Sequence, residues 1–111
     1  MKPLHEIKCV PCEGGVAPLK RDEFNAYLPQ IPTWQVVNDD HALQKNFEFK
    51  NFKETLDFVN KVGALAEQEG HHPDLNLHDW NKLTITLSTH AIGGLFINDF
   101  ALASKIDRLM R

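Results

Sequence analysis

Three histidines and two acidic residues in the second half of the chain are spaced so that they could act on one substrate. Glu67 lies four residues before His71, His72 follows directly, and His90 and Asp99 come later. Histidine gives and takes protons near neutral pH, and each positioned proton transfer contributes roughly 10²–10⁴-fold to a rate. A neighbouring carboxylate can orient an imidazole or bias its protonation. The expected chemistry is therefore general acid/base catalysis.

A long amphipathic helix is predicted to carry the first of these residues. Apolar residues recur at helical intervals from Phe52, while charged residues take positions that can face water. Gly70 supplies a stop and Pro73 cannot continue a helix, so the adjacent histidines should fall just past the helix end. If the helix persists through Gly70, Glu67 and His71 lie on the same side of its last turn. The residues expected on one face are Phe52, Leu56, Val59, Val62 or Gly63, and Ala66.

His90 is predicted at the end of a strand. Leucine and isoleucine alternate with threonine and serine over residues 83–89, which is the pattern of a strand with one buried face. His90 ends this strand on its polar side, and strand ends are common places for catalytic groups. A short preceding strand is indicated by Leu75, Leu77 and Trp80.

The remaining patterns complete an α+β fold. Residues 19–28 have apolar positions at roughly helical spacing, and two prolines then end that first helix. Residues 33–37 and 43–49 are predicted to be two strands joined by a turn, and a last helix is expected over residues 96–110. The order helix, strand, strand, helix, strand, strand, helix predicts an antiparallel sheet with helices on one face.

The first residues, 1–17, are predicted to form an irregular arm before a domain that spans residues 18–111, because they show no hydrophobic periodicity. The arm contains a Cys-x-x-Cys pair, Cys9 and Cys12. A thioredoxin-like motif should open a helix, whereas two glycines follow here. A zinc half-site that includes His5 would need a ligand from a second chain. An extension without a site of its own is the favoured interpretation.

Composition narrows the class of protein. A chain of 111 residues that is 42% hydrophobic fits one ordinary globular domain. A net charge of −3 without a Lys/Arg cluster disfavours direct nucleic-acid binding. The start lacks the apolar stretch of a secretory signal, and the longest near-apolar run, residues 91–97, is too short to span a bilayer. We therefore expect a cytoplasmic protein without membrane association.

The spacing of the candidate residues resembles the signature of the pterin-4a-carbinolamine dehydratase family. This likeness covers nearly everything from residue 18 onward. It implies a four-stranded antiparallel sheet with helices packed on one face, assembled into homodimers or homotetramers. It also implies a reaction, the loss of water from a 4a-hydroxytetrahydropterin to give a quinonoid dihydropterin, without metal or organic cofactor. The residues that carry the likeness are Glu67-x-x-x-His71-His72-Pro73, Trp80, Leu87-Ser88-Thr89-His90 and Asp99-Phe100-Ala101-Leu102-Ala103.

The same resemblance implies roles for the acid/base residues. His71 and His90 would be the principal acid/base pair, and His72 would touch the substrate and assist. Which histidine is the acid and which is the base stays open. Glu67 and Asp99 match family carboxylates that would orient and tune the histidines.

Substrate contacts are implied in the same way. Ser88 and Thr89 would hold the pterin ring by backbone and hydroxyl hydrogen bonds, and Trp80 would support the pocket wall. Asn98 stands where some relatives carry a basic residue, so a charge contact to the substrate is expected to be absent.

Three other interpretations compete with the enzyme hypothesis. His71 and His72 could simply be helix-terminal histidines that favour the negative end of the dipole. His71, His72, His90 and Asp99 could hold zinc, although adjacent histidines usually diverge and the spacing is not a familiar one. Some family members serve as dimerisation cofactors of a transcription factor or as assembly factors, so a protein-binding module is the main functional alternative. The complete set of motif residues favours the enzyme.

Overall fold

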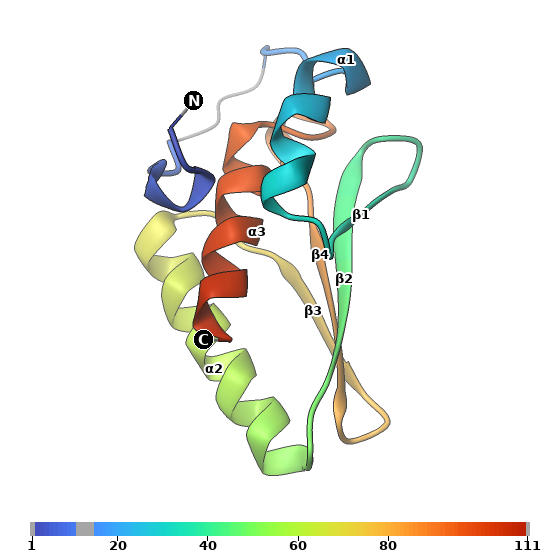
Figure 1. The fold of residues 1–111 in the computed structure, drawn as a ribbon, viewed down its shortest axis with the longest axis vertical. Coiled ribbons are helices and arrows are strands. Elements are labelled where there is room, and N and C mark those ends of the chain that lie inside the picture. The colour runs from blue at the N-terminus through green and yellow to red at the C-terminus, as the bar shows by residue number, and fades with distance from the viewer. Residues whose placement is uncertain (1, 11–14, 111) are drawn as a thin grey trace.

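A twisted four-stranded sheet covered on one face by helices makes up the protein (Figure 1). The computed structural model describes residues 2–10 and 15–110. All neighbouring strands are antiparallel, in the order β1-β2-β4-β3. This confirms the predicted α+β fold. The elements, with η for a 3₁₀ helix, are η1 (Leu4–Glu6), α1 (Arg21–Phe24), η2 (Asn25–Gln30), β1 (Gln35–Val37), β2 (Ala42–Glu48), α2 (Phe52–Glu69), β3 (Asp74–His78), β4 (Lys82–Leu87), η3 (His90–Ile92) and α3 (Ile97–Leu109).

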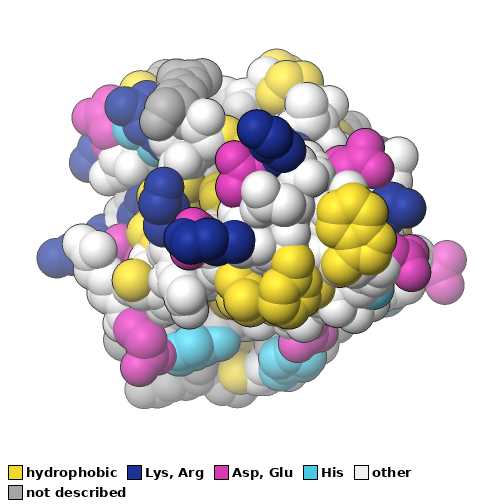
Figure 2. All heavy atoms as spheres, turned by 90° about the horizontal axis from the view of Figure 1, so that it is seen from below, with side chains coloured by type: hydrophobic (Ala, Val, Ile, Leu, Met, Phe, Trp, Pro, Cys, Tyr) yellow, Lys and Arg dark blue, Asp and Glu magenta, His cyan; other side chains and the backbone are white. Residues whose placement is uncertain are grey.

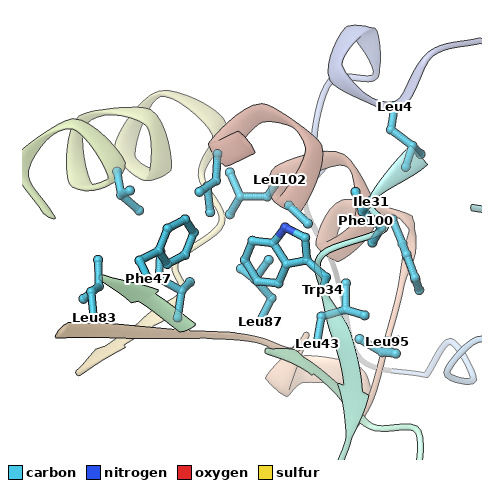
Figure 3. Close-up of a cluster of buried hydrophobic side chains, with 14 of the residues drawn as sticks. Leu4, Ile31, Trp34, Leu43, Phe47, Leu83, Leu87, Leu95, Phe100 and Leu102 are labelled. Carbon is cyan, nitrogen blue, oxygen red and sulfur yellow. The ribbon is translucent and has the colours of Figure 1, made fainter. Parts of the chain in front are cut away.

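The central strand β4 shows why the helices lie on one face. Leu83, Ile85 and Leu87 are fully buried, while the threonines between them are only partly covered. Leu43 and Phe47 of β2 pair with Leu87 and Leu83, so apolar side chains of both strands point toward the helices. Figure 3 shows this core, in which sheet residues meet Trp34 and side chains of α3. Burial of these side chains is the main driving force of the fold.

Helix α2 begins and ends where its sequence predicts, and Val62 and Ala66 are buried as expected, but the first half of the helix buries other residues than predicted. Asn51 accepts a hydrogen bond from the Glu54 amide at 2.8 Å and so caps the first turn. Gly70 has φ 67°, a left-handed conformation that glycine adopts without strain, and the helix stops there. The buried residues are Thr55, Phe58, Val62 and Ala66, whereas Phe52 and Leu56 are exposed.

An aromatic cluster accounts for this rotation of α2. The Phe58 ring centroid lies 5.2 Å from the centroids of both Phe47 in β2 and Phe49 just after it. These contacts favour a helix orientation that turns Phe58 inward. Thr55 can be buried beside it because its hydroxyl donates to the Asn51 carbonyl at 2.9 Å.

The first helix is shorter and less regular than expected. Within the predicted helix over residues 19–28, only α1 is α-helical. The 3₁₀ helix η2 follows it and continues through Pro29 instead of stopping before it. A 3₁₀ helix is common as a connector after a short α-helix. The chain then turns at Ile31 and enters β1, which begins at Gln35 rather than at residue 33.

The loop from β4 to α3 also differs from the prediction, because the strand ends at Leu87. Thr89 and Gly94 then pair across the loop, with Thr89 N–H donating to the Gly94 carbonyl at 2.8 Å. His90 therefore opens the 3₁₀ turn η3 and does not end the strand. Gly94 is packed so tightly that a Cβ there would lie 2.7 Å from the Cβ of Pro18.

The first residues pack against the domain rather than standing apart from it. Leu4 is fully buried in the core, and its amide donates to Gln30 Oε1 at 2.8 Å. Figure 1 shows η1 beside α3 and near the end of α2. Burying a leucine side chain contributes roughly 1.5–3 kcal/mol, which is enough to dock a short segment. Cys12 of the Cys-x-x-Cys pair lies outside the described residues.

A buried ion pair joins helices α2 and α3 where the N-terminal arm packs against them. Glu69 Oε1 lies 2.6 Å from Lys105 Nζ, with side chains 7% and 13% exposed. The same carboxylate oxygen accepts from the Cys9 amide at 3.2 Å. Burial opposes the charge of Glu69, but the hydrogen bonds from Lys105 and Cys9 outweigh it and lower the pKa of Glu69.

Replacing Glu69 with glutamine should lower the free energy of unfolding at neutral pH by roughly 1.5–3 kcal/mol, because Lys105 would keep its charge without a carboxylate. The stabilisation by Glu69 is complete above its ordinary pKa of 4.5 and is lost as the pH falls through its lowered folded-state pKa. Urea unfolding should therefore show the two proteins converging at acidic pH. Asp57→Asn is the matched control, because the pair of Asp57 with Lys53 is exposed. A constant difference at all pH values would contradict this prediction.

Among the residues that the structure describes, no helix has both the length and the apolar character that crossing a membrane requires.

Candidate active site

A hollow of about 230 Å³ lies where the end of α2, the end of β4 and the start of α3 meet. It brings together all three histidines that the sequence singles out. The volume is below the roughly 300–1,000 Å³ of pockets for drug-sized ligands and suits a small molecule. The residues that line it are Val10, Gly70, His71, His72, Ser88, Thr89, His90, Ala91 and Asn98.

His71 is the most firmly held of the three histidines. Its side chain is 10% exposed, and its Nε2 lies 2.6 Å from Oδ1 of the fully buried Asp99. A carboxylate can only accept hydrogen bonds, so Nε2 carries the hydrogen in this pair. When the imidazole is neutral, its lone pair is then on Nδ1. Asp99 thereby selects one tautomer and one ring orientation of His71.

Asp99 also holds the first turn of α3. Its Oδ2 accepts from the Phe96 amide at 3.0 Å and from the Thr89 hydroxyl at 2.8 Å. An acidic residue in the first turn satisfies free amides and favours the positive end of the helix dipole. Asp99 therefore joins three parts of the chain: the start of α3, the loop after β4 and the histidine after α2.

Glu67 pairs with His72 and not with His71, because the helix does not persist through Gly70, the condition under which Glu67 and His71 would share one side. Glu67 Oε2 lies 2.5 Å from His72 Nε2, and both side chains are well exposed. The cause is the left-handed Gly70, which reverses the chain so that His71 donates its amide to the Ala66 carbonyl at 3.3 Å. His71 then lies under the helix end, and His72 lies beside its outer surface. An exposed pair of this kind contributes little to stability.

His90 reaches the hollow from the other side. It is exposed and opens η3, which follows the Thr89–Gly94 bridge. The hollow therefore has a nearly buried imidazole in its floor, His71, and exposed imidazoles at its rim, His72 and His90.

Ser88 and Thr89 line the hollow, but their hydroxyl hydrogens are already engaged. Ser88 Oγ donates to the His41 carbonyl at 2.8 Å, and Thr89 Oγ1 donates to Asp99. Each oxygen keeps a lone pair that can accept a hydrogen bond from a ligand. To donate a hydrogen bond to a pterin ring, either hydroxyl would first have to give up its hydrogen bond to the protein.

Trp80 does not line the hollow. The prediction that its side chain supports the pocket wall does not hold for this hollow. Asp79 and Trp80 have φ of 49° and 57° and form the turn between β3 and β4. That turn lies at the opposite end of β4 from His90, and Trp80 is 60% exposed. Three residues, Asp79–Asn81, connect the paired His78 and Lys82, and this turn takes Trp80 off the strand.

Three lining residues were not predicted, Val10, Gly70 and Ala91, whereas the position of Asn98 near the substrate was implied by the family resemblance. Gly70 and Ala91 adjoin histidines in the sequence, which was a usable signal. Val10 comes from the arm, more than fifty residues before the motif, and nothing in its local sequence indicates this place.

Two larger hollows lie elsewhere on the described surface, and neither brings several histidines together. One of about 370 Å³ lies over β2 and β4 and contains His78, and one of about 460 Å³ lies between η1 and α3 and contains His5. Each has a single imidazole among its lining residues. Within residues 2–10 and 15–110, no group of three or more His, Cys, Asp or Glu side chains is arranged to hold a metal ion.

The fold and the site together define a small α+β protein in which histidines from two loops meet over a buried carboxylate. The chain belongs to the pterin carbinolamine dehydratase family, because the family described as "Pterin 4 alpha carbinolamine dehydratase" matches residues 17–109. Curated relatives provisionally named pterin-4-alpha-carbinolamine dehydratase agree. One from Rubrobacter xylanophilus is 51% identical and covers 98% of this chain and 100% of its own. One from Alkaliphilus metalliredigens is 50% identical, with coverage of 97% and 96%.

Two solved structures share the fold. A protein from Brucella melitensis titled transcriptional coactivator/pterin dehydratase has a TM-score of 0.76 and 29% identity, covering 83% of this chain and 97% of its own. A pterin dehydratase-like protein titled a RuBisCO assembly factor in the alpha-carboxysome has a TM-score of 0.59 and 28% identity, covering 69% and 88%.

Proposed function

We propose that the protein removes water from a 4a-hydroxytetrahydropterin, giving a quinonoid dihydropterin, by histidine acid/base catalysis in the hollow. The single observation that carries this proposal is the meeting of His71, His72 and His90 around one cavity, with His71 held by buried Asp99. Family membership supports the substrate class.

The elimination needs two proton transfers. An acid protonates the hydroxyl on C4a, the carbon–oxygen bond breaks, and water leaves. Electrons of the adjacent ring nitrogen form the new double bond to C4a, and a base takes the proton from that nitrogen. Without the acid, hydroxide would be the leaving group, and without the base, the product would stay protonated.

His71 is the best candidate for the base. Its Nε2–H is directed to Asp99, so its Nδ1 has the lone pair that accepts a proton. After the transfer the imidazolium lies 2.6 Å from a buried carboxylate, which stabilises the positive charge. Asp99 thus acts as the orienting third member of a catalytic group, as a carboxylate does in other histidine sites.

His90 is the best candidate for the acid, with His72 as its assistant. Both are exposed at the rim, where an imidazole can take up a proton from water between turnovers. They come from opposite walls of the hollow, His72 after the end of α2 and His90 at the start of η3. A flat ring between floor and rim would have its hydroxyl toward His90.

A dehydration assay with the purified protein, before and after metal is stripped from it by a chelator, tests the proposal. The carbinolamine is generated in a stopped-flow instrument, and the appearance of quinonoid dihydropterin is followed with and without a chelator. We expect rapid turnover that survives chelation. Turnover that disappears on chelation and returns with added zinc would instead support the metal hypothesis, and no acceleration over the uncatalysed reaction would reject the enzyme.

A protein-binding role is the second candidate function. Large apolar side chains are exposed away from the hollow, among them Phe52 and Trp80, and Figure 2 shows hydrophobic side chains gathered on the face at the lower end of the molecule in Figure 1. Exposed apolar patches mark interaction surfaces. The two proteins of known structure are described as a transcriptional coactivator/pterin dehydratase and as a RuBisCO assembly factor. This surface is equally suited to pairing of identical chains, which is the assembly that we expect.

A further inference from the structure

The segment from Leu4 to Val10 crosses the junction at which α2 ends and α3 begins. Leu4 fixes its first part in the core, and the Cys9 amide donates to Glu69, the last residue of α2. Both helix ends that it touches present candidate catalytic groups, because His71 follows Glu69 by two residues and Asp99 lies in the first turn of α3.

Asn98 holds the end of this segment with both ends of its amide. Its Oδ1 accepts from the Val10 amide at 3.0 Å, and its Nδ2 donates to the Val10 carbonyl at 2.7 Å. The side chain thus satisfies both backbone groups of one residue, as a neighbouring strand would. Asn98 is 1% exposed, so these bonds are shielded from water. Cys9 Sγ lies 3.7 Å from the Asn98 carbonyl and adds a third contact.

This attachment places an apolar side chain at the cavity. Val10 and Ala91 are the two apolar side chains among the residues that line the hollow, and Val10 is the larger. Val10 is 50% exposed although it is apolar, so a flat ring in the hollow could cover the exposed part. Histidines supply polar contacts from the other walls, and Val10 supplies surface for the face or edge of the ring.

We infer that the N-terminal segment is a wall of the substrate site, in which Val10 contacts the bound pterin and Asn98 is the positioning residue that holds Val10 there. This inference rests on the proposed function for the identity of the ligand. It assigns a binding role to the segment and explains why a buried amide side chain, rather than a charged one, adjoins Asp99.

The test measures binding separately from turnover. A 7,8-dihydropterin is titrated by fluorescence into wild type, Val10→Ala and Asn98→Ala, and KM and kcat are measured for dehydration. Val10→Ala should raise Kd and KM roughly fivefold, because about two buried carbon groups are lost at a half-exposed position. Asn98→Ala should raise both by roughly tenfold, because the whole segment end is released. For both variants kcat should change by less than about twofold.

Val16→Ala is the matched control, since Val16 is exposed on the same part of the chain and does not line the hollow. It should leave Kd and KM unchanged. Val10 is exposed, so its variant tests the inference even where Asn98→Ala is unstable. A lower melting temperature of Asn98→Ala with wild-type Kd in both variants would overturn the inference. If the wild type binds the pterin but does not dehydrate its carbinolamine, the proposed reaction is refuted. The Kd values of the two variants then still test whether Val10 contacts the bound pterin.

Discussion

Replacing His71 with alanine should slow dehydration by roughly 10²–10⁴-fold, the contribution of one positioned proton transfer. His71 is the histidine of the hollow that a buried carboxylate orients, so its loss should have the largest effect of the three imidazoles. The measurement is single-turnover dehydration at saturating substrate. KM should change less than kcat, because the proton transfer belongs to the transition state.

Two further variants make this result specific. His71→Gln keeps an amide hydrogen that can be donated to Asp99 but cannot transfer a proton, so it should be as slow as alanine while remaining better folded. His78→Ala is the matched control, because His78 bonds to Thr84 on β4 and does not line the hollow. Wild-type turnover in His71→Ala would remove this residue from the mechanism.

Asp99→Asn should also lower kcat by roughly 10²–10⁴-fold, although the side chain keeps its size. Three donors converge on the carboxylate, and an amide can accept with one atom only. If the NH₂ group faces His71, the imidazole must accept with Nε2 and carry its hydrogen on Nδ1, the proposed basic atom. If it faces Thr89 and the Phe96 amide, two donors lose their acceptor.

The second arrangement also destabilises the protein, by about 1–3 kcal/mol for a buried unsatisfied donor, and the first replaces a hydrogen bond to a charged group with a weaker neutral one. Urea unfolding therefore accompanies the kinetics. Asp107→Asn is the matched control, since Asp107 accepts from Trp34 Nε1 and Lys45 Nζ far from the hollow. It should lose stability while retaining turnover. Equal losses of turnover in both variants would show that Asp99 acts through stability alone.

The strand pattern and the helix boundaries were predictable because they depend on local periodicity. The alternation around Ile85 requires one buried sheet face, and Gly70 ends α2 by its backbone freedom. The rotation of α2 was not predictable, because the contacts of Phe58 with Phe47 and Phe49 are tertiary. Helical spacing alone allowed a face that starts at Phe52, which the structure leaves exposed.

The members of the hollow were largely anticipated, but their partners were not. A four-residue spacing favoured Glu67 with His71, and it could not show that a left-handed Gly70 would exchange the two histidines. The bond between His71 and Asp99 joins residues 28 positions apart, so it depends on how α2 and α3 pack. The contact of Asn98 with Val10 spans 88 positions and had no local signal at all.

The tight packing at Gly94 limits how this protein could be redesigned or could diversify. Any side chain at position 94 must displace Pro18, which lies 2.7 Å from the place of its Cβ. Ala91 and Gly93 are exposed on the same loop, but Gly93 has φ 70°, which strains any residue other than glycine even though no heavy atom lies within 4 Å of a Cβ built there. New side chains that alter ligand preference are therefore tolerated best at Ala91, while the base of the loop at Gly94 tolerates almost no change in volume.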